Sequence, residues 1–345
     1  MSRVEKLFKL RKLFLLVLLL LLLLLIPLSI SIGTLGATLL DALRLLLGDS
    51  SIPIEVRAAL LLRLRRVLAS IAIGVVLGAG GACMQAVLRN PMASPFTLGI
   101  SHAAALGVAL SLLLGVAGST RYRVVYIHNP YILPIFAFTF SLLQVAIILA
   151  LAYRAKLTER ALILAAVAMS FFYQAILSLV QYLALNELQV AMVVFWTFGD
   201  VGRVDWVALR VLAVVAGVLA VYYITRSLDL DLISLGDDVA YASGVNPKRL
   251  RLEATIVSAF GASVATAFAG VIAFLCLVAP HIVRLVVGNS HRYLVPASML
   301  VGAVLLLVAD GIGRTVVNPV ILPVGIVLSF IGAPLLLYLL LRGGG

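Results

Sequence analysis

The chain has 345 residues, of which 63% are hydrophobic and 12% are charged, and its mean hydropathy is +1.20. Water-soluble domains do not tolerate so apolar a composition, so the chain is expected to lie in membrane lipid. Its net charge of +12 would suggest a nucleic-acid partner in a soluble protein. No basic stretch with interleaved aromatic residues lies outside the apolar runs, however, which argues against nucleic-acid binding.

The first apolar run follows a basic amino-terminal head. It extends from Leu13 to about Ile32, which is longer than the roughly 7–15 apolar residues of a signal peptide. No clear small-x-small cleavage site follows. We therefore predict a retained first span, with its amino terminus held in the cytoplasm by the positive-inside rule. The basic residues of the head are Arg3, Lys6, Lys9, Arg11 and Lys12.

Apolar runs separated by loop residues continue to the end of the chain and predict an all-α, polytopic protein with about ten transmembrane helices. An even number of spans would place both termini on the cytoplasmic side of the cytoplasmic membrane. We expect one transmembrane permease domain over residues 1–345. The predicted spans are 13–32, 66–87, 97–117, 131–153, 160–184, 206–225, 252–270, 272–287, 295–312 and 321–341.

Two small-residue runs, 74–85 and 261–270, predict helix faces that pack closely. They fall in the second and seventh spans, which would run in opposite directions. This placement suits an inverted repeat that relates spans two to five to spans seven to ten. The largest predicted cytoplasmic insertion is 226–251, which contains four of the fourteen acidic residues and a short amphipathic stretch.

Six sequence blocks, in order from Arg63 onward, resemble the FecCD family of permeases, whose members import iron–siderophore complexes, haem and cobalamin. The resemblance implies the type II fold of ATP-binding-cassette (ABC) importer permeases. It also implies a homodimer with two ATPase subunits inside, one substrate-binding protein outside and a metal chelate as substrate. The blocks are RLRRVLASIAIGVVLGAGGACMQAVLRNPMASPFTLGIS (63–101), FWTFGDVGRVDW (195–206), LGDDVAYASGVNPKRLR (235–251), GVIAFLCLVAPHIVRLV (270–286), HRYLVPAS (291–298) and ADGIGR (309–314) with LPVGIVLSFIGAP (322–334).

The sequence contains no G-x-x-x-x-G-K-[ST] phosphate cradle. If transport uses ATP, another chain must hydrolyse it. We therefore expect a chain that is not an enzyme and has no cofactor of its own, with ATP and magnesium bound by the partner ATPase.

By resemblance, Arg63, Arg66 and Arg314 dock the binding protein through salt bridges. Arg65 departs from the family pattern, which has proline there. Arginines at an outer membrane face oppose the positive-inside rule, so a docking function would explain them. Two alternatives stay open, because the side chains could reach lipid headgroups and Arg314 could pair with Asp310, four residues earlier.

The segment 235–251 resembles the family's cytoplasmic coupling segment, whose short helices seat in the ATPase. Two glycines bound a seven-residue stretch with two acids near its start, a favourable place for acids in a helix. The acids are expected to cap this helix. A solvated loop is the alternative. The coupling residues are Leu235, Gly236, Asp237, Asp238, Ala242 and Gly244.

By resemblance to its relatives, the fifth span is expected to line the translocation path. Its residues at helical spacing could face a cavity, although such a stripe is also typical of packing. Many relatives carry small hydroxyl residues at the inner mouth, where this chain has Glu159 and Arg160, so the chemistry of the gate stays open. The path residues are Glu159, Arg160, Ala166, Met169 and Tyr173.

The alternative functional classes are an ion-coupled secondary transporter and an intramembrane enzyme. The first would need an ionisable residue buried in mid-span, and the acids in the predicted spans lie at or just past their ends. The second would need a catalytic pair, which the spans do not offer. No metal site is predicted at His281, because the other histidines, His102, His128 and His291, have no i,i+4 partner and no nearby cysteine to complete a site.

Overall fold

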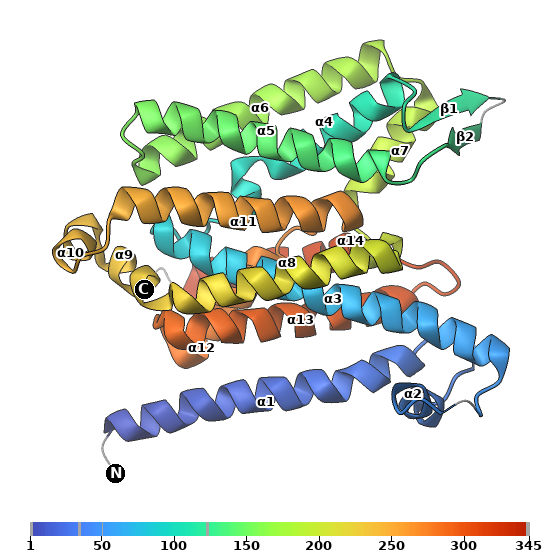
Figure 1. The fold of residues 1–345 in the computed structure, drawn as a ribbon, viewed down its shortest axis with the longest axis horizontal. Coiled ribbons are helices and arrows are strands. Elements are labelled where there is room, and N and C mark those ends of the chain that lie inside the picture. The colour runs from blue at the N-terminus through green and yellow to red at the C-terminus, as the bar shows by residue number, and fades with distance from the viewer. Residues whose placement is uncertain (1–2, 34–35, 50, 122–123, 343–345) are drawn as a thin grey trace. The chain divides into compact units, whose positions relative to one another are not determined.

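A computed structural model describes residues 3–33, 36–49, 51–121 and 124–342. Helices dominate this part of the chain, and one short β-hairpin interrupts them (Figure 1). The elements are α1 (Arg3–Ser31), α2 (Leu39–Leu46), α3 (Ile54–Val87), the 3-10 turn η1 (Pro95–Leu98), α4 (Ile100–Leu113), β1 (Gly118–Arg121), β2 (Val124–Ile127), α5 (Ile132–Arg154), α6 (Glu159–Leu183), α7 (Glu187–Thr197), the 3-10 turn η2 (Val201–Arg203), α8 (Trp206–Thr225), α9 (Ser227–Leu235), α10 (Asp237–Ala242), α11 (Pro247–Ala269), α12 (Leu275–Val287), α13 (His291–Thr315) and α14 (Val324–Arg342).

Each of the ten predicted spans coincides with a helix, and seven of these helices are long and apolar enough to cross a membrane: α1, α3, α5, α6, α8, α11 and α13. The apolar parts of α4, α12 and α14 are shorter than a full span. The polytopic helical architecture is therefore confirmed, and the count of ten is approximate.

The predicted start of the second span was wrong. Helix α3 begins at Ile54 rather than at residue 66. Leucine, alanine and arginine fill its first turns, and all three favour a helix whether or not the segment lies in lipid. Hydropathy therefore marked only the apolar part of a longer helix.

Local capping explains where several helices begin. Thr38 and Asp41 form a reciprocal capping box at α2, in which each side chain bonds the other residue's backbone N–H. Asp205 accepts a hydrogen bond from the Ala208 N–H at the start of α8. Asn246, followed by Pro247 at the first helical position, starts α11.

The contacts group the chain into two compact units, each built from separate stretches of sequence. Unit 1 comprises residues 1–82, 200–228 and 273–345, and unit 2 comprises residues 83–199 and 229–272. The expectation of one permease domain over 1–345 stays a prediction.

In unit 1, α13 is the central helix and packs against α1, α8, α12 and α14. Its core includes Leu60, Val67 and Leu307. The predicted small-residue face on α3 is confirmed, because a Cβ atom at Gly74 would meet the Ala303 backbone and one at Gly78 would meet the Ser298 carbonyl. Helices α3 and α13 therefore approach each other as closely as their backbones permit.

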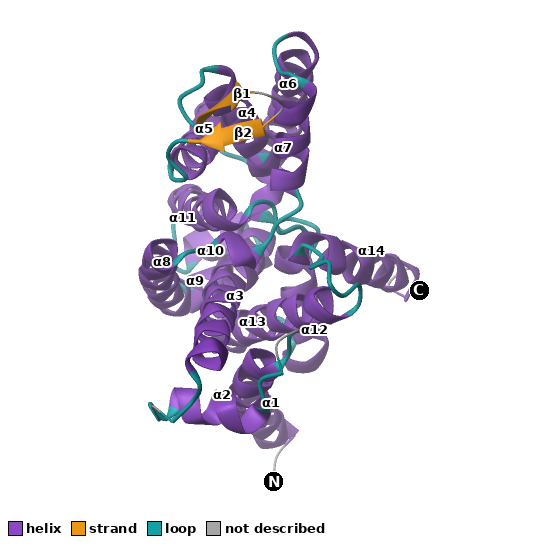
Figure 2. Ribbon diagram, turned by 90° about the vertical axis from the view of Figure 1, so that its right-hand side faces the viewer, coloured by secondary structure: helices purple, strands orange, loops and turns teal. Residues whose placement is uncertain are grey.

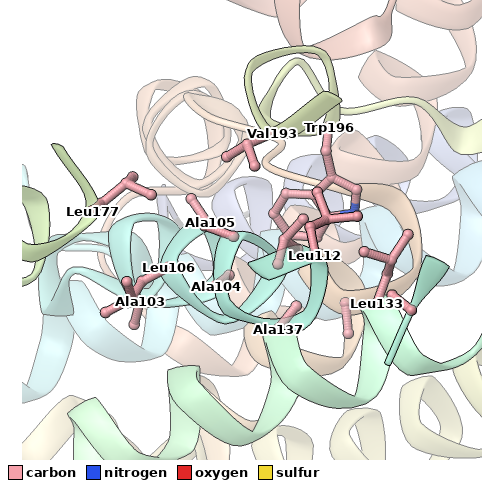
Figure 3. Packing of buried hydrophobic residues seen from close by; sticks show 14 of the residues in the cluster. Ala103, Ala104, Ala105, Leu106, Leu112, Leu133, Ala137, Leu177, Val193 and Trp196 are labelled. Carbon is pink, nitrogen blue, oxygen red and sulfur yellow. The ribbon is translucent and has the colours of Figure 1, made fainter. Parts of the chain in front are cut away.

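In unit 2, α4 packs against α5, α6 and α7, while α11 packs against α4 and α5. Figure 3 shows side chains from three neighbouring helices, including Leu177, Trp196 and Ala137, gathered around α4. The β-hairpin connects α4 to α5 and pairs Gly118 with Ile127, and β2 lies beside α7 (Figure 2). The sequence analysis predicted neither the hairpin nor α7.

Candidate functional site

A cluster of buried charges joins α3 and α13 in unit 1; we call it the arginine cluster, and its members are Arg63, Arg65, Arg66, Asp200, Asp310 and Arg314. The Asp310 side chain is fully buried. One of its oxygens accepts a 2.6 Å hydrogen bond from Arg66 Nη2, and the other lies 2.9 Å from Arg314 Nε. Arg66 Nη2 also donates to Asp200 Oδ1 over 3.1 Å. The pairing of Arg314 with Asp310, an open alternative in the sequence, is present in the structure.

Two arginines of the cluster bind the carboxyl end of α1. Arg63 Nη1 donates to the carbonyl oxygens of Ile30 and Ser31 over 3.3 and 3.0 Å. Arg314 donates to the carbonyls of Ile32 and Ser29 over 2.7 and 3.0 Å. These carbonyls are the ones that an α-helix leaves without partners, so the two guanidiniums cap α1 and tie it to α3 and α13.

The expected docking arginines therefore have partners inside the chain, and Arg63 and Arg314 are only 8% and 6% exposed. Beside them lies a cavity of about 490 Å³, whose lining includes all four arginines of the cluster and Glu55. Within the described residues, the buried Arg65 Nε has no hydrogen-bond partner. Docking at Arg63, Arg66 and Arg314 stays a prediction, and Arg65 is a cavity-lining cation that the sequence analysis did not select.

The segment predicted to couple to an ATPase contains the short helix α10, as its two glycines indicated. Gly236 and Gly244 bound it with φ angles of +131° and +86°, a region of backbone space that side chains disfavour. Its apolar surface is unusually open for a charged loop, since Leu235 is 71%, Val239 42% and Tyr241 73% exposed.

The predicted capping role of the two acids was wrong for Asp237. The residue before α10 is Gly236, which makes no side-chain cap, and Asp237 turns instead to Arg251. Hydrogen bonds from Arg251 are the main cause that lowers the pKa of the Asp237 carboxyl below its usual value. A charged partner is stronger than a backbone N–H, so the carboxylate leaves the helix end. Asp238 is exposed.

Asp237 belongs to a second charged group in unit 2, the Arg251 network, which comprises Arg89, Glu159, Asp237 and Arg251. Arg251 Nη2 lies 2.8 Å from Asp237 Oδ1 and 3.5 Å from Glu159 Oε2. Arg89 Nε donates to Glu159 over 2.8 Å, and Arg89 also pairs with Asp237 over 3.9 Å. The structure thus places the predicted path residue Glu159 beside the predicted coupling residue Asp237.

The remaining predicted path residues, all on α6, are not part of the Arg251 network. Ala166 and Tyr173 are buried, and Met169 packs beside Tyr173 at the core of unit 2. Packing, the alternative that the sequence left open, accounts for this stripe within the chain. Arg160 is exposed. Pore lining by these residues stays a prediction.

A cavity of about 320 Å³ in unit 2, lined by both polar and apolar side chains, was missed by the sequence analysis. Its lining includes His102 on α4 and Gln174 and Gln181 on α6. The spacing of the two glutamines, seven residues apart, places them on one helix face and could have revealed it. Among the described residues, no group of three histidine, cysteine, aspartate or glutamate side chains could hold a metal ion.

Comparison with known proteins supports the architecture. A Methanocaldococcus jannaschii protein named as an ABC transporter permease is 45% identical over 282 residues, which cover 81% of this chain and 80% of that protein. The hemin transport system permease protein HmuU of Yersinia pestis is 34% identical over 281 residues, covering 81% and 82%.

A solved structure, described as an inward-facing conformation of a metal-chelate type ABC transporter, superposes with a TM-score of 0.80 at 26% identity. The superposition covers 96% of this chain and 99% of that chain, which confirms the predicted permease fold. Residues 20–342 also match the model of the FecCD transport family. The chain therefore belongs to the FecCD transport family, as its six sequence blocks indicated.

Proposed function

We propose that the chain is the membrane-spanning permease subunit of an ABC importer that moves a metal chelate across the cytoplasmic membrane. The observation that carries this proposal is the family match over residues 20–342. Similarity to a hemin permease and to a metal-chelate type transporter favours the chelate class. Within that class, an iron–siderophore complex, haem and cobalamin are the candidate substrates.

The ATPase is proposed to be a separate subunit, because the sequence lacks a phosphate cradle. The surface formed by α10 and the end of α9 suits such a partner: Leu235, Val239 and Tyr241 expose apolar area beside the acidic Asp238. Exposed apolar side chains edged by charge are typical of protein interfaces. ATP and magnesium would belong to that subunit.

A homodimer and an extracytoplasmic binding protein complete the proposed assembly. Few residues of helix α6 are buried within the chain, only 17% of those in its most apolar stretch. A second copy or lipid would cover it. The cavity beside the arginine cluster is cationic, which suits acidic side chains of a binding protein. On this proposal both termini lie in the cytoplasm.

The buried acid Asp310 does not support an ion-coupled secondary transporter. Asp310 is paired with both Arg66 and Arg314, so its charge is compensated. A carboxylate that must bind and release a proton or sodium ion during transport would lose that freedom in such an arrangement.

The first prediction tests the division of labour. The purified chain alone should hydrolyse no ATP, because it has no phosphate cradle. Proteoliposomes that also contain the cognate ATPase and binding protein should accumulate one of haem, a ferric siderophore or cobalamin only when ATP is supplied. Radiolabelled uptake and phosphate release are the measurements. Magnesium-dependent hydrolysis by the chain alone, or uptake driven by an ion gradient without ATP, would contradict the proposal.

The second prediction concerns the cavity beside the arginine cluster. Arg65→Ala should slow association with the binding protein by about two- to fivefold, the effect of one partly exposed ion pair. The salt dependence of the association rate should also flatten. Arg57→Ala is the matched control, because Arg57 is exposed on the same helix and does not line the cavity. Equal association rates for the two variants in surface plasmon resonance would show that the cavity is not a docking site.

A further inference from the structure

Arg251 joins three segments that are far apart in the sequence. Its side chain is 1% exposed. Nε donates to the Val87 carbonyl at the end of α3 over 3.0 Å, and Nη1 donates to the Leu157 carbonyl before α6 over 3.1 Å. Nη2 donates to Asp237 at the start of α10 over 2.8 Å. One rigid guanidinium plane therefore holds three backbone segments in a fixed relation.

The carboxylates of Glu159 and Asp237 make the positions of these segments depend on one another. Glu159, the first residue of α6, binds both Arg89 and Arg251, and Asp237 also lies near both arginines. A buried guanidinium is stable only when it is neutralised and hydrogen-bonded, so Arg251 requires these acids in place. A displacement of Asp237 would therefore disturb the bonds that Arg251 makes to the segment before α6.

The backbone shows that the network constrains its own loops. Arg89 and Leu157 have φ angles of +45° and +52°, in the left-handed region that residues other than glycine rarely occupy. One contributes its side chain to the network, and the other contributes its carbonyl. Such conformations persist where the surrounding structure holds them, and they are frequent in elements that switch.

Helix α10, by contrast, lies between two conformationally permissive backbone positions. These are Gly236, directly before it, and Gly244, shortly after it. Its buried Ala240 packs it against the protein, while Tyr241 on its other side is exposed. The Arg251–Asp237 ion pair, at 2.8 Å, is therefore the shorter of two charged links between this short helix and the start of α6; the other runs through Arg89, 3.9 Å from Asp237.

We infer that Arg251 is a positioning residue that transmits displacement of α10, through Asp237, to the segment 157–159 at the start of α6. The inference rests on the proposed function, in which α10 contacts the ATPase and Glu159 lies at the inner mouth of the path. The role of the network is therefore distinct from docking. The partner binds the exposed side of α10, and Arg251 relays the movement from the buried side.

The test weakens the link without emptying the buried site. Asp237→Asn keeps the size of the side chain and removes its charge, and the Asp237 side chain is 42% exposed, so the variant is expected to fold. Three quantities are compared in proteoliposomes with the cognate ATPase and binding protein: recovery of the ATPase, its ATP hydrolysis rate, and chelate uptake per ATP hydrolysed. Recovery and hydrolysis should match the unaltered protein. Uptake per ATP should fall by roughly 2- to 30-fold, the range in which substitutions along a coupling network change the coupling.

Glu253→Gln is the matched control. It also converts an acid to its amide and breaks a 2.7 Å ion pair on α11, with Arg249. Uptake per ATP should be unchanged in this variant. Arg251→Lys extends the test, because it keeps the charge but loses the guanidinium fork, and it should reduce uptake per ATP in the same direction as Asp237→Asn.

The outcomes separate the inference from the proposed function. Uptake per ATP that is unchanged in Asp237→Asn would overturn the inference alone. Loss of ATPase recovery in Asp237→Asn would also overturn it, because the network would then serve docking rather than transmission. If the unaltered chain recruits no ATPase, the proposed function fails and the inference falls with it.

Discussion

Replacing Asp310 with alanine is expected to destabilise the protein by about 3–5 kcal/mol, the cost of leaving buried charges without a partner. The Asp310 side chain is fully buried, and Arg66 and Arg314 both depend on it. Both guanidiniums would lose their nearest negative charge while their side chains stay largely buried, at 13% and 5% exposure. A thermal melt of the detergent-purified variant, followed by loss of the folded fraction in size-exclusion chromatography, measures the effect.

Asp200→Ala is the control for this prediction. Asp200 also binds Arg66, but its side chain is 27% exposed, so water can replace it and the cost should stay within about 1 kcal/mol. A second variant, Asp310→Ala with Arg314→Met, removes one of the stranded cations and should recover part of the loss. Equal melting temperatures for Asp310→Ala and Asp200→Ala would refute the assignment of Asp310 as the centre of the cluster.

The second large effect is expected at the close approach of α3 and α13. Gly78→Leu should cost about 3 kcal/mol or more, at or beyond the upper end of what overpacking of a tight interior costs. Even a Cβ atom at this position would press on the Ser298 carbonyl, which belongs to backbone that cannot rotate aside. The helices would have to separate and give up the contacts around Gly74 and Gly302. Thermal melting in detergent again provides the measurement.

Gly217→Leu provides the matched comparison. Gly217 lies within α8, and a Cβ atom there would meet nothing within 4 Å. Because leucine favours a helix more than glycine does by close to 1 kcal/mol, this variant should be neutral or slightly stabilised. If both leucine variants lowered the melting temperature equally, crowding between α3 and α13 could not be the cause.

Much of the fold could be predicted because lipid imposes simple rules on sequence. Each apolar run that was chosen as a span coincides with a helix. The glycines around Gly74 identified a close helix contact that the structure confirms. Elements with weaker hydropathy signals were missed: α2 is short and α7 is only eleven residues long. Their starts carry capping boxes, at Thr38 and Asn186, which were the available signal.

The candidate sites were harder to predict because their partners are remote in the chain. Arg66 and Asp310 are 244 residues apart, and no local pattern connects them. Asp237 was expected to cap its own helix, yet Arg251, fourteen residues further on, binds it more strongly than a backbone N–H would. The residue types were recognisable in the sequence, whereas their pairing depends on how the helices pack.

The capping of α1 by Arg63 and Arg314 has a consequence for how the protein is made. The ribosome synthesises α1 first, but Arg314 emerges only after more than 280 further residues, given its separation of 285 residues from Ser29. Until then the carbonyls at the end of α1 have only part of their final set of donors. A nascent chain arrested before residue 314 should therefore expose this helix end to proteolysis, and the synthesis of α13 would close it.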